Sequence, residues 1–291
     1  MPAWSARLLG GEELRFHQRT ISSLPDVWWP LFACLLAAPR SRLSRSRVAG
    51  LLWPERDETA ARHCLATALW RIRRRLPCDQ TMLVVEEEAI SLRLGNCWID
   101  TAVLERRAVR IATEPDLLRD RSERERLTRA LAAYRGSFMP ERQVEWIAVE
   151  RERLRTLFLD ALYELGLAEM ADGRFERARG AARRLCEVEP LREDAQRLLM
   201  TAHVRCGSRG VALAQYRSLQ KLLRSELGIE PMPETRTLAE RIAAGAETAF
   251  ASSQTSRPGS SSVAGADRSL LLMAREHLTQ SLALIDKTIA G

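Results

Sequence analysis

The chain has 291 residues, of which 46% are hydrophobic and 29% are charged, and its net charge is +7. This balance is typical of a globular protein of about two domains and excludes a chain that is disordered throughout. The first 80 residues hold 13 arginines against seven acidic residues, so the excess charge is concentrated there and favours a polyanionic partner.

The N-terminal segment predicts a short hairpin followed by a helix. Residues 7–16 contain a Gly-Gly turn signal between two strand-like stretches. A helix is expected over residues 26–38, or from Trp29 onward if Pro30 delays its start.

Two more helices are expected before residue 77. Ser44 is suited to cap a short helix at residues 45–52, and Asp57 or Thr59 is suited to cap a longer one that runs to Leu76. One face of the longer helix is an apolar stripe made of Ala61, Leu65, Leu69, Ile72 and Leu76. The opposite face is basic and polar and carries Arg62, His63, Thr67, Trp70, Arg71, Arg73 and Arg74.

After residue 77 the apolar pattern changes from the helical period to that of strands. Residues 82–85 and 90–94 predict a strand pair around an acidic turn at 86–88, and residues 98–100 lead out of this unit. Strands, three helices and a terminal hairpin occur in this order in an OmpR-like winged helix–turn–helix. We therefore predict a DNA-binding domain at residues 1–99.

From residue 100 to about residue 244 every segment has the apolar spacing of a helix. Leu165, Gly173, Ala178 and Leu185 recur 34 positions later as Leu199, Gly207, Ala212 and Leu219. A period of 34 residues is the length of a tetratricopeptide repeat, so residues 100–246 predict an all-α domain of that type. Residues 247–267 predict a flexible linker, and residues 268–291 predict a C-terminal amphipathic helix. The predicted fold class is therefore mainly α, with an α+β winged helix at the N-terminus.

A helix that enters the DNA major groove needs a basic outer face and an apolar inner face, and the helix ending at Leu76 has both. Arginines at positions 40, 42, 45 and 47 could hold phosphates. The candidate DNA-binding residues are Arg45, Arg47, Arg62, His63, Thr67, Trp70, Arg71, Arg74 and Arg93. The alternative is a solvated arginine-rich helix and an exposed basic loop. Trp70 could pack against the helical domain or contact a thymine methyl group, and three consecutive glutamates in the wing oppose phosphate binding.

Other classes of site are not indicated. The chain has no glycine-rich phosphate loop, no paired histidines on a helix and no locally supported Ser/His/Asp arrangement, so no enzymatic activity is expected. His203 and Cys206 lie three residues apart without a second ligand pair, so neither a metal nor another cofactor is expected.

Cysteine usage and the N-terminal residues bear on the cell compartment. The six cysteines form no CxxC pair, and the N-terminus has no apolar signal sequence. We therefore expect a cytoplasmic, nucleoid-associated protein. The apolar stretch 27–38 is too short to span a bilayer, so no membrane contact is expected.

Several segments of the chain resemble the SARP-type transcriptional regulators. Residues 51–54 (LLWP) and 61–76 (ARHCLATALWRIRRRL) are similar to the positioning and recognition helices of that family. Residues 134–138 (YRGSF), 146–154 (WIAVERERL) and 227–235 (LGIEPMPET) resemble its bacterial transcriptional activator domain.

The resemblance covers about residues 6–244 and implies a function. It implies binding to repeated sites in double-stranded promoter DNA, commonly as a homodimer, and activation through contact with RNA polymerase. The chain departs from the family at its first helix, which lacks a basic opening, and at its acidic wing. Two alternatives remain: a protein-interaction adaptor with a degenerate winged helix, and a repressor whose helical domain binds a ligand.

Overall fold

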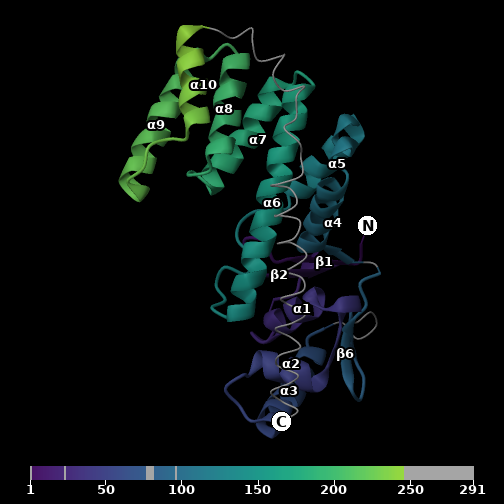
Figure 1. Ribbon diagram of the computed structural model, residues 1–291. Helices are drawn as coiled ribbons and strands as arrows, with labels where there is room; N and C mark the ends of the chain where they lie inside the picture. The colour runs from purple at the N-terminus through teal and green to yellow at the C-terminus, as the bar shows by residue number, and fades with distance from the viewer. Residues whose placement is uncertain (1, 23, 77–81, 96, 246–291) are drawn as a thin grey trace. The chain divides into compact units, whose positions relative to one another are not determined.

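The computed structural model describes residues 2–22, 24–76, 82–95 and 97–245 (Figure 1). The chain forms two compact units, and each is described by itself. The first comprises Met1–Arg106 and Ala132–Arg151, and the second comprises Arg107–Leu131 and the chain from Glu152 onward. The predicted linker at 247–267 and helix at 268–291 lie outside the described residues.

The first unit begins with a four-stranded sheet in the order β3-β2-β1-β7. Its strands are β1 (Trp4–Arg7), β2 (Glu13–Phe16), β3 (Arg19–Thr20) and β7 (Cys97–Ile99). The antiparallel pairing of β1 with β2 confirms the predicted hairpin. Residues 98–100 were expected to lead out of the strand pair at 82–94. Instead, β7 pairs in parallel with β1, and Trp98 lies opposite Ser5. No local sequence pattern predicts this pairing, since it joins strands more than 90 residues apart.

Three helices and a second sheet complete the winged-helix part of the first unit. The helices are α1 (Trp28–Ala37), α2 (Arg45–Leu52) and α3 (Glu58–Arg73). The sheet has the order β4-β6-β5 and consists of β4 (Arg42–Ser44), β6 (Ala89–Leu92) and β5 (Leu83–Val85). Figure 1 shows α2 and α3 side by side, and α1 packs on both α2 and β6. The buried core between them includes Trp28, Leu31, Phe32, Leu65 and Ile72.

The prediction that every segment after residue 100 is helical is wrong for residues 132–144, which form turns and extended chain between two helices. Tertiary contacts of this segment within the first unit override its local pattern. Phe138 forms an isolated bridge with Leu9, and the Met139 amide donates to the Leu8 carbonyl oxygen at 2.9 Å. Gly10, at φ +91°, lies so close to Gly136 that a Cβ on Gly136 would stand 3.0 Å from the Gly10 Cα.

Every secondary-structure element in the described part of the second unit is a helix. Its chain runs through part of α4 (Asp100–Thr113), a short 3₁₀ turn at Pro115–Arg119, α5 (Arg121–Leu131) and most of α6 (Glu145–Ala171). It continues through α7 (Phe175–Val188), α8 (Glu193–Arg205), α9 (Arg209–Leu227) and α10 (Pro233–Ala244). Figure 1 shows α7 to α10 as neighbouring helices, in agreement with their mutual packing.

The predicted 34-residue repeat corresponds to two helix pairs, α6–α7 and α8–α9. Gly173 and Gly207 adopt φ values of +73° and +75° where the first helix of each pair ends, a conformation that favours glycine. Gly166 allows α6 and α8 to approach closely, because a Cβ there would meet the Leu198 Cδ2 at 2.7 Å. The mainly α fold with an N-terminal winged helix is confirmed.

Candidate nucleic-acid interface

The helix α3 has two chemically distinct faces. Its first turn is capped by Asp57, whose Oδ1 accepts from the Ala60 amide at 2.9 Å. All five residues of the predicted apolar stripe are buried, but α3 ends at Arg73 rather than at Leu76, so four of them hold the helix on the core and Leu76 packs there from the turn that follows. The predicted outer residues are all exposed: Arg62, His63, Thr67, Trp70, Arg71, Arg73 and Arg74.

Two arginines of the basic face each contact a side chain one turn earlier in the chain. The Arg74 guanidinium lies 4.9 Å from the centroid of the Trp70 ring, a cation–π contact. The Trp70 side chain is 58% exposed, so the ring belongs to the surface rather than to the core of its own unit. Arg62 pairs with Glu58 one turn earlier at 2.5 Å, and this exposed pair is weak enough to exchange for another anion.

The helix α2 comes before α3 in the chain, and Ser44 caps it as predicted. The Ser44 Oγ accepts from the Arg47 amide at 3.3 Å, which fixes the first turn. Arg45 and Arg47 lie in that turn and are half-buried. Their backbone position at a helix start, where amide groups and the helix dipole favour an anion, suits a phosphate contact.

The acidic wing is partly neutralised from within the fold. The turn at 86–88 joins β5 to β6, and the Glu86 carboxylate pairs with Arg42 of β4 at 2.6 Å. The Arg45 guanidinium also donates to the Glu86 carbonyl oxygen at 3.5 Å. Arg93, the wing cation singled out from the sequence, is exposed at the end of β6. The pairing of Arg42 with Glu86 could not be predicted from local sequence patterns, because 44 residues separate the two side chains.

Asp100 supports the sheet next to these helices. Its carboxylate is buried and accepts from the amides of Leu8 at 2.8 Å, Leu9 at 2.9 Å and Thr101 at 2.8 Å. Burial raises the pKa of Asp100, and these amide donors act in the opposite direction. The residue therefore ties the end of β7 to the chain that follows β1.

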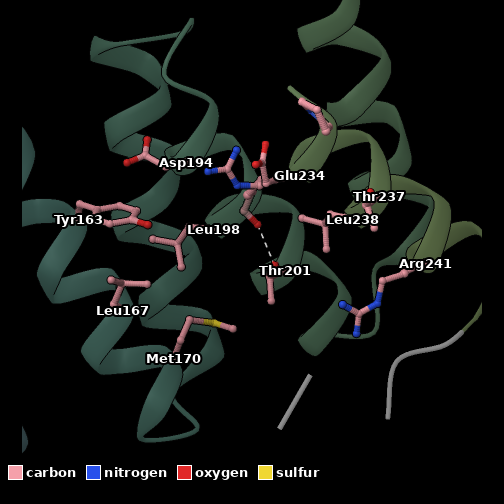
Figure 2. Close-up of a pocket in the computed structure, with 12 residues that line it drawn as sticks. Tyr163, Leu167, Met170, Asp194, Leu198, Thr201, Glu234, Thr237, Leu238 and Arg241 are labelled. Carbon is pink, nitrogen blue, oxygen red and sulfur yellow. Dashed lines mark hydrogen bonds between the residues drawn. The ribbon is translucent and has the colours of Figure 1, made fainter. Parts of the chain in front are cut away.

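The second unit has a groove of about 470 Å³ between α6, α8 and α10 (Figure 2). Leu167, Met170 and Leu198 form apolar parts of its wall, and Asp194, Glu234 and Arg241 bring charges of both signs to it. Burial raises the pKa of Tyr163, which also lines the groove, and the Asp194 carboxylate adds to the shift.

Two kinds of feature, a cluster of metal-binding side chains and a membrane-spanning helix, are absent from the described residues. No group of three or more histidine, cysteine or acidic side chains there is placed to share a metal ion. None of the helices in the described part combines the length and the apolar character that crossing a bilayer requires.

Known regulatory proteins share parts of this sequence. Residues 99–243 match the bacterial transcriptional activator domain. The chain is 30% identical over 222 residues to the regulatory protein AfsR of Streptomyces coelicolor and 28% identical over 221 residues to that of Streptomyces griseus. The chain belongs to the SARP-type transcriptional regulators. Each of these matches covers 73% of the chain but only 22% of the relative, so the chain spans about a fifth of the length of those relatives.

A solved structure resembles the SARP-type chain over most of its length. Mycobacterium tuberculosis EmbR in complex with a low-affinity phosphopeptide matches with a TM-score of 0.64 and 20% sequence identity. The match covers 98% of the SARP-type chain and 72% of the EmbR chain. At this identity the likeness concerns the fold alone.

Proposed function

We propose that the protein is a sequence-specific DNA-binding transcriptional activator that inserts α3 into the major groove of promoter DNA. The observation that carries the proposal is the division of α3 into a buried apolar stripe and an exposed basic face. Arg71 and Arg74 would supply bidentate contacts to guanine edges or phosphates, since a guanidinium presents paired donors.

The other candidate residues have roles that follow from their positions. Arg45 and Arg47 at the start of α2 would hold phosphates and set the register without reading bases. Arg62, His63, Thr67 and Trp70 would face the groove beside Arg71, and Arg93 would contact the backbone from the wing. The pairing of Arg42 with Glu86 supports the proposal, because it lowers the repulsion that the acidic wing would otherwise exert.

We propose a division of labour between the predicted domains. Residues 1–99 would bind DNA, and residues 100–246 would supply contacts to RNA polymerase and to a second copy of the chain. The family membership supports activation as the outcome, and the protein would then act at the nucleoid in the cytoplasm.

The test is footprinting on the DNA upstream of the protein's own reading frame, at low and at moderate salt. Arg71→Ala should weaken a protected site by about 1–3 kcal/mol, which is roughly 5- to 150-fold in affinity. The matched control is Arg106→Ala, an exposed arginine on α4, and should leave the footprint unchanged. If about six cations neutralise phosphates, affinity should fall about a thousandfold between 50 and 200 mM salt.

Two outcomes would contradict the proposal. An unchanged footprint with Arg71→Ala would show that α3 does not read the site. No protection at low salt by the folded protein would favour the adaptor with a degenerate winged helix.

A further inference from the structure

A second cavity in the repeat-containing unit has a different chemistry from the groove of Figure 2. It has a volume of about 700 Å³ and lies between α5, α6 and α7. Its apolar floor is formed by Leu131, Leu162, Leu165 and Ala181, all of them buried. The volume and the apolar floor are typical of a site for a small organic molecule.

The rim of this cavity is positively charged. Arg129, Arg177 and Arg184 line it together with two acidic residues, Glu125 and Glu169. Glu125 is already paired with Arg121 at 2.9 Å, and that hydrogen bond holds the pKa of Glu125 below its usual range. The lining therefore holds three arginines against two glutamates, one of which is already paired, so an anionic ligand is favoured over a cationic one.

One buried group in the wall lacks a hydrogen bond. The Glu169 side chain is 3% exposed, and its Oε2 accepts no hydrogen bond from any residue that the structure describes. Its nearest cations are the guanidinium groups of Arg124, Arg174 and Arg177, at 3.8 to 3.9 Å, beyond hydrogen-bond reach. Arg124 and Arg174 both donate instead to Asp172, at 2.7 and 2.9 Å.

A buried carboxylate oxygen without a hydrogen-bond donor is costly, and such atoms in folded proteins usually have a partner. The donor could come from the ligand, because Glu169 lines the cavity and so does Arg177, whose guanidinium lies 3.9 Å from the Glu169 carboxylate and whose side chain is 54% exposed. A ligand whose acidic group bonds Arg177 would bring an adjacent hydroxyl toward Glu169.

We propose that this cavity binds a small amphipathic organic acid with a hydroxyl group beside its carboxylate. The carboxylate pairs with Arg177 and Arg129 at the rim, the hydroxyl donates to Glu169, and the apolar body covers the leucine floor. The residues of this site are not those of the DNA-binding face of α3. A failure of this proposal would therefore not contradict the proposed function, and a failure of the proposed function would not contradict this proposal.

The experiment is isothermal titration of the full chain with three probes: 2-hydroxydecanoate, decanoate and decylammonium. The wild-type chain should bind 2-hydroxydecanoate about tenfold more tightly than decanoate, since a hydrogen bond to a charged acceptor contributes about 1.5 kcal/mol. Decylammonium has the same apolar body with the opposite charge and should bind most weakly.

Two variants locate the site and separate its parts. Arg177→Glu should weaken binding of both anions about tenfold, because it replaces an attraction with a repulsion. Arg217→Glu makes the same charge change at an exposed position of α9 away from the cavity and should have no effect. Glu169→Gln should reduce the preference for 2-hydroxydecanoate to about twofold and leave decanoate bound at least as tightly, because a neutral acceptor bonds more weakly.

The opposite results overturn the proposal. Tight binding of decylammonium would refute the charge argument, and equal effects of Arg177→Glu and Arg217→Glu would place the ligand elsewhere. A wild-type chain that binds none of the probes, or that does not distinguish the two acids, would show that Glu169 and the rim do not form a ligand site.

Discussion

Replacing Asp100 should destabilise the first unit, because its carboxylate satisfies three buried backbone donors. An asparagine at this position keeps the shape but has a single acceptor oxygen, and its amide nitrogen would face another N–H group. An alanine removes every acceptor for the amides of Leu8, Leu9 and Thr101. Each buried donor that loses its partner costs about 1–3 kcal/mol.

The magnitude follows from the number of donors left unpaired. Asp100→Asn should lower the free energy of unfolding by about 2 kcal/mol, and Asp100→Ala by about 4 kcal/mol. Both variants also remove a buried charge whose desolvation opposes folding, as the raised pKa of Asp100 indicates. The stability gained by removing this charge does not offset the stability lost with the hydrogen bonds, because the three backbone donors stay buried in either variant.

Urea denaturation followed by tryptophan fluorescence measures this effect selectively. All seven tryptophans fall within Met1–Arg106 or Ala132–Arg151, so the signal reports on the first unit alone. Glu55→Gln makes the same carboxylate-to-amide change at an exposed position and should stay within about 0.5 kcal/mol of the wild-type value. If Asp100→Ala fell within about 1 kcal/mol of the wild type, the backbone donors would have other partners and the reasoning would be wrong.

Two further predictions concern acid stability. Arg142 bonds Glu12 and Asp26 at 2.5 to 2.8 Å and lowers the pKa of Asp26. The contribution of the Arg142–Asp26 pair to the free energy of unfolding is therefore complete above 3.8, the pKa of Asp26 in the unfolded chain. It is lost as the pH falls through the lower pKa of Asp26 in the folded chain. Arg142→Met should therefore cost about 1–2 kcal/mol at neutral pH and less at pH 3 by the same fluorescence assay, and an equal cost at both pH values would contradict this. Burial lowers the pKa of His203, with Arg179 and Arg183 adding to the shift and Glu176 opposing it, so stability is lost as the pH falls below the unfolded value of 6.5. His203→Gln cannot take up that proton and should flatten the loss between pH 6.5 and 5 in far-UV circular dichroism, whereas an unchanged pH profile would exclude His203 as the cause.

The local signals of the winged helix were sufficient to predict α2 and α3. Ser44 and Asp57 cap these helices as expected, and the apolar stripe is buried, although α3 ends at Arg73, three residues before the predicted end. The reason is that capping and helical amphipathicity depend on residues within one or two turns of each other. The repeat in the second unit was likewise visible, because a fixed period places equivalent glycines and leucines at equivalent turns.

Trp53, Trp98 and Trp146 are half-buried, whereas Trp28 is fully buried. Apolar character alone does not tell which of several tryptophans will be enclosed. That outcome depends on the neighbours that the fold brings to each ring.

The sequence by itself determined the order and type of most helices, the basic face of α3 and the two glycine-ended repeats, because each depends on residues close together in the chain. Only the tertiary structure decided the pairing of β7 with β1, the irregular course of residues 132–144, and the meeting of Arg42 with Glu86. It also decided the position of Glu169 in a cavity wall. These features join residues from distant parts of the chain, and their energies arise from burial and hydrogen bonding that no local pattern specifies.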